Sequence, residues 1–265
     1  MDGGRGVLVT GAAGRIGAAV ARAFAGLGDR VVATDLDVDR LAATARAITE
    51  RGGAAKAIPA DLTDEAAIER LVAAALAALG RVEVLVNCAG IFPNSQVVDL
   101  PTAEWDRVYA VNLRAPFLLC RAVARHMLEH AIAGAIVNIS SGAGSSARTG
   151  GAHYCGSKAA LEMLTKVLAI ELGPRGIRVN AVAPGLILDA VLAPPVPVGT
   201  GPYVRALLDG IPLRRTGRPE EIADAVVFLC SARAAWISGT VLGVNGGSQA
   251  GRTHLPPSAP PAARP

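Results

Sequence analysis

A tyrosine and a lysine four residues apart are the first candidates for chemistry in this sequence. They are Tyr154 and Lys158, in the stretch GAHYCGSK (151–158), which we expect to form the first turns of a helix. Side chains four residues apart project from one face of a helix. An ammonium beside a phenol favours the phenolate and lowers the phenol pKa from about 10, so the pair could move a proton on or off an alcohol. The same spacing recurs on ordinary surface helices, so the surrounding residues must decide.

A serine provides part of that context. Ser141 lies thirteen residues before Tyr154, just past the apolar stretch GAIVNIS (134–140), which reads as a buried strand. In a doubly wound sheet the active crevice lies outside the carboxyl ends of the strands. We therefore expect Ser141 to meet Tyr154 in that crevice.

A glycine-rich turn near the start of the sequence indicates a dinucleotide. TGAAGRIG (10–17) joins an apolar strand to an amphipathic helix, and such a turn lets the backbone and the helix N-terminus approach a pyrophosphate. Asp35 stands eighteen residues beyond Gly17, near the spacing of a carboxylate that binds the adenosine ribose and repels a 2′-phosphate. We expect NAD rather than NADP. Two alternatives stay open, because Asp35 could merely cap the next helix and Arg15 could reach a 2′-phosphate or the pyrophosphate.

The elements that would position these residues alternate along the chain. Short β-branched runs predict strands at 6–10, 30–35, 54–60, 82–87, 134–140, 177–183 and 239–247. Longer stretches rich in Ala and Leu predict helices at 15–28, 38–51, 64–80, 102–130, 153–173 and 218–230, with Thr63 as a cap for the third. Seven strands separated by helices indicate an α/β fold, a doubly wound and mostly parallel seven-stranded sheet with helices on both faces.

Two segments break the alternation. Residues 186–213 hold five prolines and no clear strand, and they follow a strand end, so we expect a substrate lid within a single domain of residues 1–250. The lid carries apolar side chains and one cation, Arg205, which favours a mainly apolar alcohol or ketone substrate. Residues 251–265 hold five more prolines, and we expect a disordered tail.

Composition narrows the remaining classes. With 51% hydrophobic and only 3% aromatic residues, the core must consist of small aliphatic side chains, which suits buried parallel strands. The net charge of +4 comes from scattered arginines, so no nucleic-acid surface is indicated. Four distant cysteines and the pair His126 and His130, without a third ligand nearby, predict free thiols and no metal site. The N-terminus is unlike a signal peptide and no apolar run spans a membrane, so we expect a soluble cytoplasmic protein.

Taken in order, the motifs resemble those of the short-chain dehydrogenase/reductase family, compact single-domain branch, over about residues 5–248. They are TGAAGRIG, NCAG (87–90), VNLRAPF (111–117), NISS (138–141), YCGSK (154–158), NAVAPG (180–185) and RPEEIADAVVFL (218–229). The resemblance implies a Rossmann fold. The sequence departs from the usual family pattern at three positions. Arg15 replaces a glycine, and Cys88 replaces an asparagine. Asp189 replaces a threonine that commonly contacts the nicotinamide carboxamide.

The resemblance also implies roles for particular residues. Tyr154 would be the acid/base, and Lys158 would lower its pKa while binding the nicotinamide ribose. Ser141, rather than Ser140, would bind the substrate oxygen, and Asn112 would hold a water of the proton relay. The residues expected to contact the cofactor are Gly11, Gly14, Arg15, Ile16, Gly17, Asp35, Asp61, Leu62, Asn87, Ala89, Gly90, Tyr154, Lys158, Pro184, Gly185 and Ile187. His153 is expected to point away from the reacting atoms, because adjacent helix residues face about 100° apart.

The function expected from these features is NAD(H)-dependent interconversion of a secondary alcohol and a ketone. The resemblance implies a homotetramer or homodimer assembled through the helices near 114–130 and 153–173. Two other functions stay open: reduction of a 3-oxoacyl thioester with NADPH, and non-catalytic dinucleotide binding by a regulator. A nucleic-acid role would rest on net charge alone.

Overall fold

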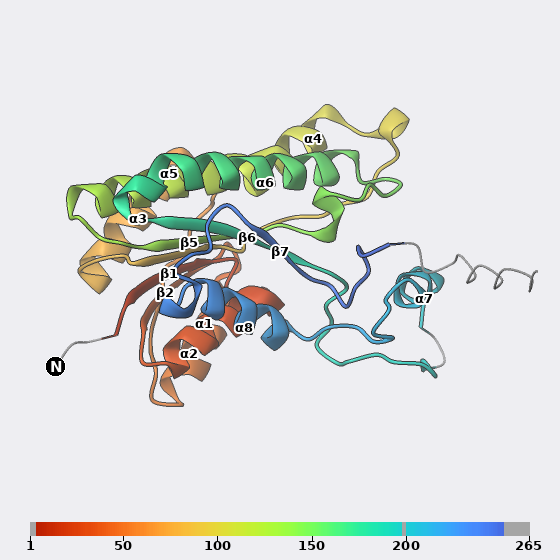
Figure 1. The fold of residues 1–265 in the computed structure, drawn as a ribbon, viewed down its shortest axis with the longest axis horizontal. Coiled ribbons are helices and arrows are strands. Elements are labelled where there is room, and N and C mark those ends of the chain that lie inside the picture. Colours follow the sequence, from red (N-terminus) through yellow and green to blue (C-terminus); the bar gives the residue numbers. More distant parts are fainter. Residues whose placement is uncertain (1–3, 198–199, 252–265) are drawn as a thin grey trace, which may run out of the picture.

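The central element is a seven-stranded parallel sheet, seen in a computed structural model that describes residues 4–197 and 200–251 (Figure 1). The strands are β1 (Gly6–Thr10), β2 (Arg30–Thr34), β3 (Ala54–Ala57), β4 (Val84–Asn87), β5 (Ala135–Ile139), β6 (Arg178–Pro184) and β7 (Val241–Val244). They run in the order β3-β2-β1-β4-β5-β6-β7, and each neighbouring pair is parallel. The predicted doubly wound sheet is confirmed. The order reverses between β1 and β4, and a crevice for a ligand is expected beside that switch point.

Helices cover both faces of the sheet. One face carries α1 (Arg15–Gly26), α2 (Val38–Thr49) and α8 (Pro219–Leu229); the other carries α3 (Glu65–Leu79), α4 (Thr102–Tyr109), α5 (Ala115–Glu129) and α6 (Ala152–Leu172) (Figure 1). Successive residues of a strand point to opposite faces. In β1, Val7 and Val9 accordingly belong to the core under α1 and α8, whereas Leu8 belongs to the core under α3 and α5. Both cores consist mainly of aliphatic side chains, as the composition predicts, with Phe24 in the first core and Met127 in the second.

The segment after β6 contains a helix that was not predicted from the sequence. Helix α7 (Pro202–Asp209) begins with a proline in its first turn, and its Leu208 is buried. Proline fits the first turn because its missing N–H has no intrahelical partner there. Figure 1 shows α7 beyond the carboxyl ends of the strands, outside the helical layers. A short parallel bridge between Ile187 and Gly217 ties the start of this segment to its end.

Two local features of the helices differ from the prediction. Asp64 caps α3, because its carboxylate accepts a hydrogen bond from Ala66 N at 2.9 Å, while the Thr63 hydroxyl donates to Asp61 instead. The helix predicted at 102–130 is interrupted by a π-helical turn, Ala110–Arg114, between α4 and α5. Such turns often occur at functional sites, and this one carries Asn112.

Two expectations remain, one about the proline-rich tail and one about membrane-spanning helices. The proline-rich tail expected at 251–265 lies almost wholly outside the described residues, of which Gly251 is the last. Within 4–197 and 200–251, none of the helices combines the length and the hydropathy needed to cross a bilayer.

Candidate active site

The glycine loop between β1 and α1 is packed so tightly that side chains are excluded at two positions. Gly11 has φ +68°, and an added Cβ would lie 2.6 Å from the backbone N of Ala89. At Gly17, a Cβ would collide with the backbone of Gly11. Helix α1 then begins at Arg15 with no acidic residue in its first turn. The loop thus leaves bare backbone and a helix N-terminus at the sheet edge, which fits the pyrophosphate of a dinucleotide.

Asp35 joins this loop to the end of β2. One carboxylate oxygen accepts from Ala13 N at 3.0 Å, and the other accepts from Leu36 N at 2.7 Å and Asp37 N at 3.1 Å. The helix that follows is capped by Asp37 through Arg40 N, at 3.0 Å. Asp35 is therefore not the cap of α2, and this half-buried residue lies at the expected end of β2.

Arg15 forms an ion pair that was not predicted from the sequence. Its Nε lies 2.7 Å from an Asp189 oxygen, and the two side chains are 53% and 69% exposed. The pair joins the glycine loop to the segment after β6. Both residues differ from those usual in the family at these positions, and in this structure the two unusual residues form an ion pair with each other.

The remaining residues expected at the cofactor are distributed along the strand ends. Thr10 Oγ1 accepts from Cys88 N and Ala89 N at 3.0 and 3.1 Å, which fixes the stretch after β4 beside the glycine loop. Asn87 donates to Asn138 at 2.8 Å and so braces β4 against β5. The Asp61 carboxylate accepts from Thr63 N and Oγ1, and these bonds lower its pKa. The side chains of Ile16, Leu62 and Ile187 pack against the two cores.

The four residues proposed for catalysis do come together. A Cβ added to Gly90 would lie 3.4 Å from Asn112 Oδ1 and 3.5 Å from Lys158 Nζ, so these two side chains flank Gly90. Lys158 Nζ lies 5.9 Å from the centre of the Tyr154 ring. The Ser141 hydroxyl interacts with the Tyr154 phenol and lowers its pKa. The cluster lies at the carboxyl ends of β4 and β5, where the crevice was expected.

Asn112 holds the chain after β4 against α6. Its side-chain oxygen accepts from Ile91 N at 2.9 Å, and its amide donates to Ile91 O at 2.8 Å and to Ser157 Oγ at 3.2 Å. The side chain is fully buried. The π-helical turn at 110–114 places this amide among its partners, so Asn112 positions the loop that precedes it as well as facing the cluster.

Lys158 is a buried cation. The residue is 4% exposed, and Nζ donates to Ile139 O at 2.8 Å. Burial lowers its pKa from 10.5 to about 8, because desolvation disfavours the ammonium. The group therefore exchanges its proton much closer to neutral pH than an exposed lysine does.

Tyr154 differs from the prediction in its electrostatics. Burial raises its pKa above the ordinary value, while the Ser141 hydroxyl and then the charge of Arg148 lower it. The expected lowering by Lys158 is not found, because the ammonium is turned toward Ile139 O. Ser140 is occupied elsewhere, since it donates to Glu162 at 2.7 Å. Ser141 is thus the serine that reaches the tyrosine.

Arg148 is a site residue that the sequence analysis missed. Its guanidinium carbon lies 4.8 Å from the centre of the Tyr154 ring, and Nη1 donates to the Tyr203 hydroxyl of α7 at 3.2 Å. Phe92 meets the same ring edge-on, with centroids 6.3 Å apart. His153 is fully buried and bonds to Glu104 of α4 at 3.2 Å. A single arginine in a loop has no pattern of spacing, so no signal in the sequence pointed to Arg148.

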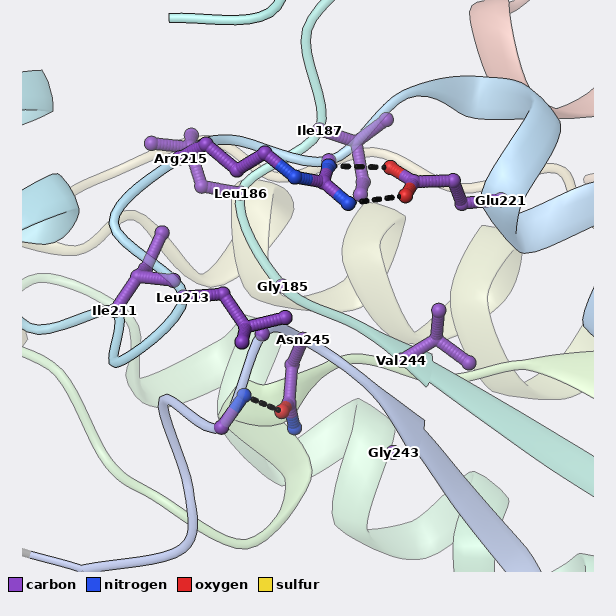
Figure 2. Close-up of a pocket in the computed structure, with 13 residues that line it drawn as sticks. Gly185, Leu186, Ile187, Ile211, Leu213, Arg215, Glu221, Gly243, Val244 and Asn245 are labelled. Carbon is purple, nitrogen blue, oxygen red and sulfur yellow. Dashed lines mark hydrogen bonds and ion pairs between the residues drawn. The ribbon is translucent and has the colours of Figure 1, made fainter. Parts of the chain in front are cut away.

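A cavity of about 270 Å³ lies at the ends of β6 and β7. Figure 2 shows Leu186, Ile187 and Leu213 around it, with Arg215 and Glu221 joined at its rim. The two bonds of that ion pair measure 2.6 and 2.9 Å, and they hold the Glu221 pKa at about 2. Gly185 and Ile187, expected near the nicotinamide, line the cavity. The four residues of the tyrosine cluster are not among the described residues that line it.

Comparisons with known proteins agree with this geometry. A family model described as enoyl-(acyl carrier protein) reductase matches residues 11–249. The chain is 40% identical to D-threitol dehydrogenase of Mycolicibacterium smegmatis, over 92% of both chains, and 40% identical to 3beta-hydroxysteroid dehydrogenase 1 of Eggerthella lenta, over 92% of this chain and 93% of the relative. The solved structure of a double mutant of a Serratia marcescens short-chain dehydrogenase/reductase superposes with a TM-score of 0.85 at 35% identity, covering 93% of this chain and 98% of that one. The chain belongs to the short-chain dehydrogenase/reductase family.

Membership of this family also establishes the reaction class. The chain is an NAD(P)-dependent oxidoreductase that acts on CH–OH groups. The glycine loop and the strand ends beside it fit the dinucleotide, because Gly11 and Gly17 leave no side chain over the backbone there.

Proposed function

We propose that this chain interconverts a secondary alcohol and a ketone with NAD(H), using Tyr154 as the acid/base. The observation that carries the proposal is the convergence of Tyr154, Ser141, Lys158 and Asn112 next to a dinucleotide loop. The relatives at 40% identity are named for dehydrogenation of a polyol and a steroid, and both names describe reactions of a CH–OH group.

The proton would be handled by the side chains of the cluster. The nicotinamide dinucleotide held at the glycine loop would supply or take up the hydride. In the oxidation direction, the Tyr154 phenol first passes its own proton to the relay of Lys158 and Asn112, against its raised pKa. The resulting phenolate removes the hydroxyl proton as the carbinol carbon loses its hydride. With substrate bound, Ser141 would turn its one hydroxyl hydrogen from Tyr154 to the substrate oxygen and stabilise the charge that develops on it. In reduction, the neutral phenol of Tyr154 returns the proton to the oxygen.

Two further residues would supply and remove protons at Tyr154. Lys158 has a pKa of about 8, so its ammonium can release a proton without a large barrier near neutral pH. Its Nζ also lies near the tyrosine ring, 5.9 Å from its centre. Asn112 would hold a water near the lysine through the remaining lone pair of its side-chain oxygen, because both amide hydrogens are donated to Ile91 O and Ser157 Oγ. General acid–base catalysis of this kind contributes about 10²- to 10⁴-fold to a rate.

Asp35 supports NAD over NADP. Its carboxylate stands at the end of β2 beside the glycine loop, bonded to Ala13 N at 3.0 Å. A 2′-phosphate placed there would be repelled by the carboxylate, whereas ribose hydroxyls can donate to it. Arg15 is paired with Asp189 in a mostly exposed ion pair, so the preference for NAD rests on Asp35.

An assembly through α5 and α6 is part of the proposal. Phe117 of α5 and Met163, Val167 and Ile170 of α6 are all at least 42% exposed, and Ile170 reaches 76%. Apolar side chains on one pair of neighbouring helices suit a contact between copies. We propose a homotetramer or homodimer, to be measured by sedimentation of the purified chain. The four free cysteines support a reducing compartment such as the cytoplasm.

The test is a turnover assay on the purified protein. Nicotinamide absorbance would be followed with secondary alcohols and NAD⁺ or NADP⁺, and with ketones and 3-oxoacyl thioesters and NADH or NADPH. We expect turnover of alcohols and ketones with NAD(H), and its loss in Tyr154→Phe with NADH binding retained. Turnover of thioesters alone, with NADPH, would favour the acyl reductase instead. NADH binding without any turnover would favour a regulator.

A further inference from the structure

Arg148 has an unusual environment for an arginine. Its guanidinium stacks on the face of the Tyr154 ring, with 4.8 Å between the guanidinium carbon and the ring centre, and it donates to Tyr203 at 3.2 Å. Its Nε is buried and donates to no described residue. Of the carboxylates within 4–197 and 200–251, none forms an ion pair with it. The nine ion pairs found in that part of the chain lie elsewhere.

This environment leaves a positive charge without its ordinary counterion. Buried or partly buried charges in proteins are normally paired, because removing an ion from water costs several kcal/mol in practice. Arg148 is partly buried: its bond to Tyr203 is exposed to solvent, whereas Nε is buried, and there the aromatic face replaces only part of the lost hydration. The free donors of a guanidinium form a planar fork that matches a carboxylate with two parallel bonds. The missing partner is therefore expected to be an anion that arrives with a ligand.

The place of Arg148 identifies that ligand as the substrate. The arginine contacts the ring of the residue that exchanges the proton, and its partner Tyr203 comes from α7, in the segment expected to cover the substrate. Phe92 supplies an apolar surface next to the same ring. Arg148 is thus the cation on the α7 side of the Tyr154 ring, whereas the ammonium of Lys158 is turned toward Ile139 O.

We propose that Arg148 forms an anion subsite, so that the preferred substrates are apolar secondary alcohols or ketones carrying one carboxylate. This inference rests on the proposed function and sharpens its substrate class. The carboxylate accepts from the guanidinium while the carbinol or carbonyl oxygen meets Tyr154 and Ser141. Arg205, the cation expected in the lid, is not the anchor. Its Nε and Nη2 donate to the backbone oxygens of Thr200 and Pro197, at 2.9 and 3.4 Å.

The phenolate of Tyr154 is the competing partner for this charge. Arg148 lowers the pKa of Tyr154, so its charge acts on the tyrosine whether or not a substrate anion is present. The guanidinium nevertheless contacts the ring face, and no hydrogen bond joins it to the phenol oxygen in the described part of the chain. The experiment must therefore separate substrate recognition from a change in the pH profile.

Matched acid and ester substrates separate the two effects. The probes are 4-acetylbenzoate and acetoacetate with their methyl esters, reduced with NADH by the unmodified enzyme, Arg148→Met, Arg148→Lys and Arg205→Met. We expect the unmodified enzyme to prefer each acid over its ester by about 10- to 100-fold in kcat/KM, the usual contribution of charge-assisted hydrogen bonds. Arg148→Met abolishes the preference and Arg148→Lys keeps part of it, while Arg205→Met leaves it unchanged. Loss of preference through KM, with the pH profile for the ester unmoved, supports the subsite.

Three results would overturn the inference. The first is equal turnover of acids and esters by the unmodified enzyme, which leaves the proposed function intact. The second is an Arg148→Met variant that slows acids and esters alike and shifts the pH profile, since Arg148 would then act on Tyr154 alone. The third applies if the enzyme reduces none of these ketones and none of the broader panel, which means that the proposed function itself has failed. Calorimetric titration of 4-acetylbenzoate into the NADH complex then decides: absent binding, or binding that survives Arg148→Met, overturns the subsite.

Discussion

The two sides of Tyr154 are built in different ways. On the helix side, Lys158 and Asn112 are buried in regular structure, and backbone groups fix both side chains, Ile139 O for the lysine and Ile91 N and O for the asparagine. On the loop side, Arg148 and Tyr203 come from connections, and their contact is a side-chain bond of 3.2 Å between a loop and a short helix. Substitutions on the helix side disturb the core, whereas substitutions on the loop side can be made without disturbing it.

This difference suggests a division of labour. Groups held by buried backbone bonds keep the geometry that a proton transfer requires. Groups on loops can change from one protein to the next without loss of the fold, which suits the recognition of a substrate. We therefore expect changes on the helix side to affect every substrate, and changes on the loop side to affect only some.

The largest effect is expected at Ser141, which follows the buried strand β5 and takes part in the proton transfer together with the helix-side residues. Ser141→Ala removes the hydroxyl that interacts with Tyr154 in the free enzyme and would donate to the substrate oxygen in the complex. We expect kcat to fall by about 100-fold or more, as for the loss of one oxyanion donor. Ser140→Ala is the matched control. It removes a bond to Glu162, and because one hydrogen bond is worth about 1 kcal/mol of stability, the melting temperature should fall. Since Ser140 does not contact Tyr154, kcat should stay within about threefold. Steady-state kinetics and thermal unfolding distinguish the two, and equal losses of kcat would contradict the assignment of Ser141.

The next effect concerns the cofactor loop. Asp35→Asn removes the negative charge of the carboxylate and keeps the shape of the side chain. Because the 2′-phosphate of NADP would then no longer be repelled, we expect the ratio of kcat/KM for NADP over NAD to rise by about 10- to 100-fold. Asp37→Asn, at the cap of α2, is the control and should leave the ratio unchanged. An unaltered ratio in Asp35→Asn would mean that the ribose lies elsewhere.

A smaller effect, on stability, is expected at Lys158. The folded-state pKa is lowered from 10.5 to about 8, so below pH 8 folding must desolvate an ammonium. Between about pH 8 and 10.5 the unfolded chain binds more protons, and the stability of the native enzyme rises with pH. Lys158→Met should therefore raise the free energy of unfolding at pH 7 by on the order of 2 kcal/mol, and the difference should vanish near pH 10.5. The variant loses activity. A lower melting temperature at pH 7 would show that the charge stabilises the fold.

The smallest effect is expected where the glycine loop meets the lid segment. Arg15 and Asp189 form a mostly exposed pair, and such pairs contribute about 0–1 kcal/mol. A double-mutant cycle of Arg15→Ala and Asp189→Ala, followed by thermal unfolding, should give a coupling below about 1 kcal/mol that shrinks in high salt. A larger, salt-independent coupling would mean that the pair is part of the structural core.

Most of the fold and the helix-side residues could be predicted from sequence because their signals are local. The apolar runs that form β1 and β4 to β6 are buried on both faces, and TGAAGRIG needs glycine where Gly11 adopts a positive φ. The spacing of Tyr154 and Lys158 follows from one helix. Asp64 and Thr63 compete for the same cap, so the prediction missed by one residue.

The loop side could not be predicted, because its contacts join residues far apart in the chain. Arg148 meets Tyr203 across 55 positions, and Arg15 meets Asp189 across 174. The raised pKa of Tyr154 was missed for the same reason. Its environment depends on burial by loops, and the spacing to Lys158 alone does not describe it. Helix α7 was not predicted, because the prolines in and around it indicate a loop rather than a helix.

The most direct test of this division compares one variant from each side on the same pair of ketones. Ser141→Ala and Arg148→Met would each be assayed with 4-acetylbenzoate and its methyl ester, and the ratio of kcat/KM for acid over ester recorded. We expect Ser141→Ala to slow both reactions equally and keep the native ratio, and Arg148→Met to reduce the ratio to near one. A ratio that changes as much in Ser141→Ala as in Arg148→Met would contradict this expectation, since chemistry and recognition would then share the same residues.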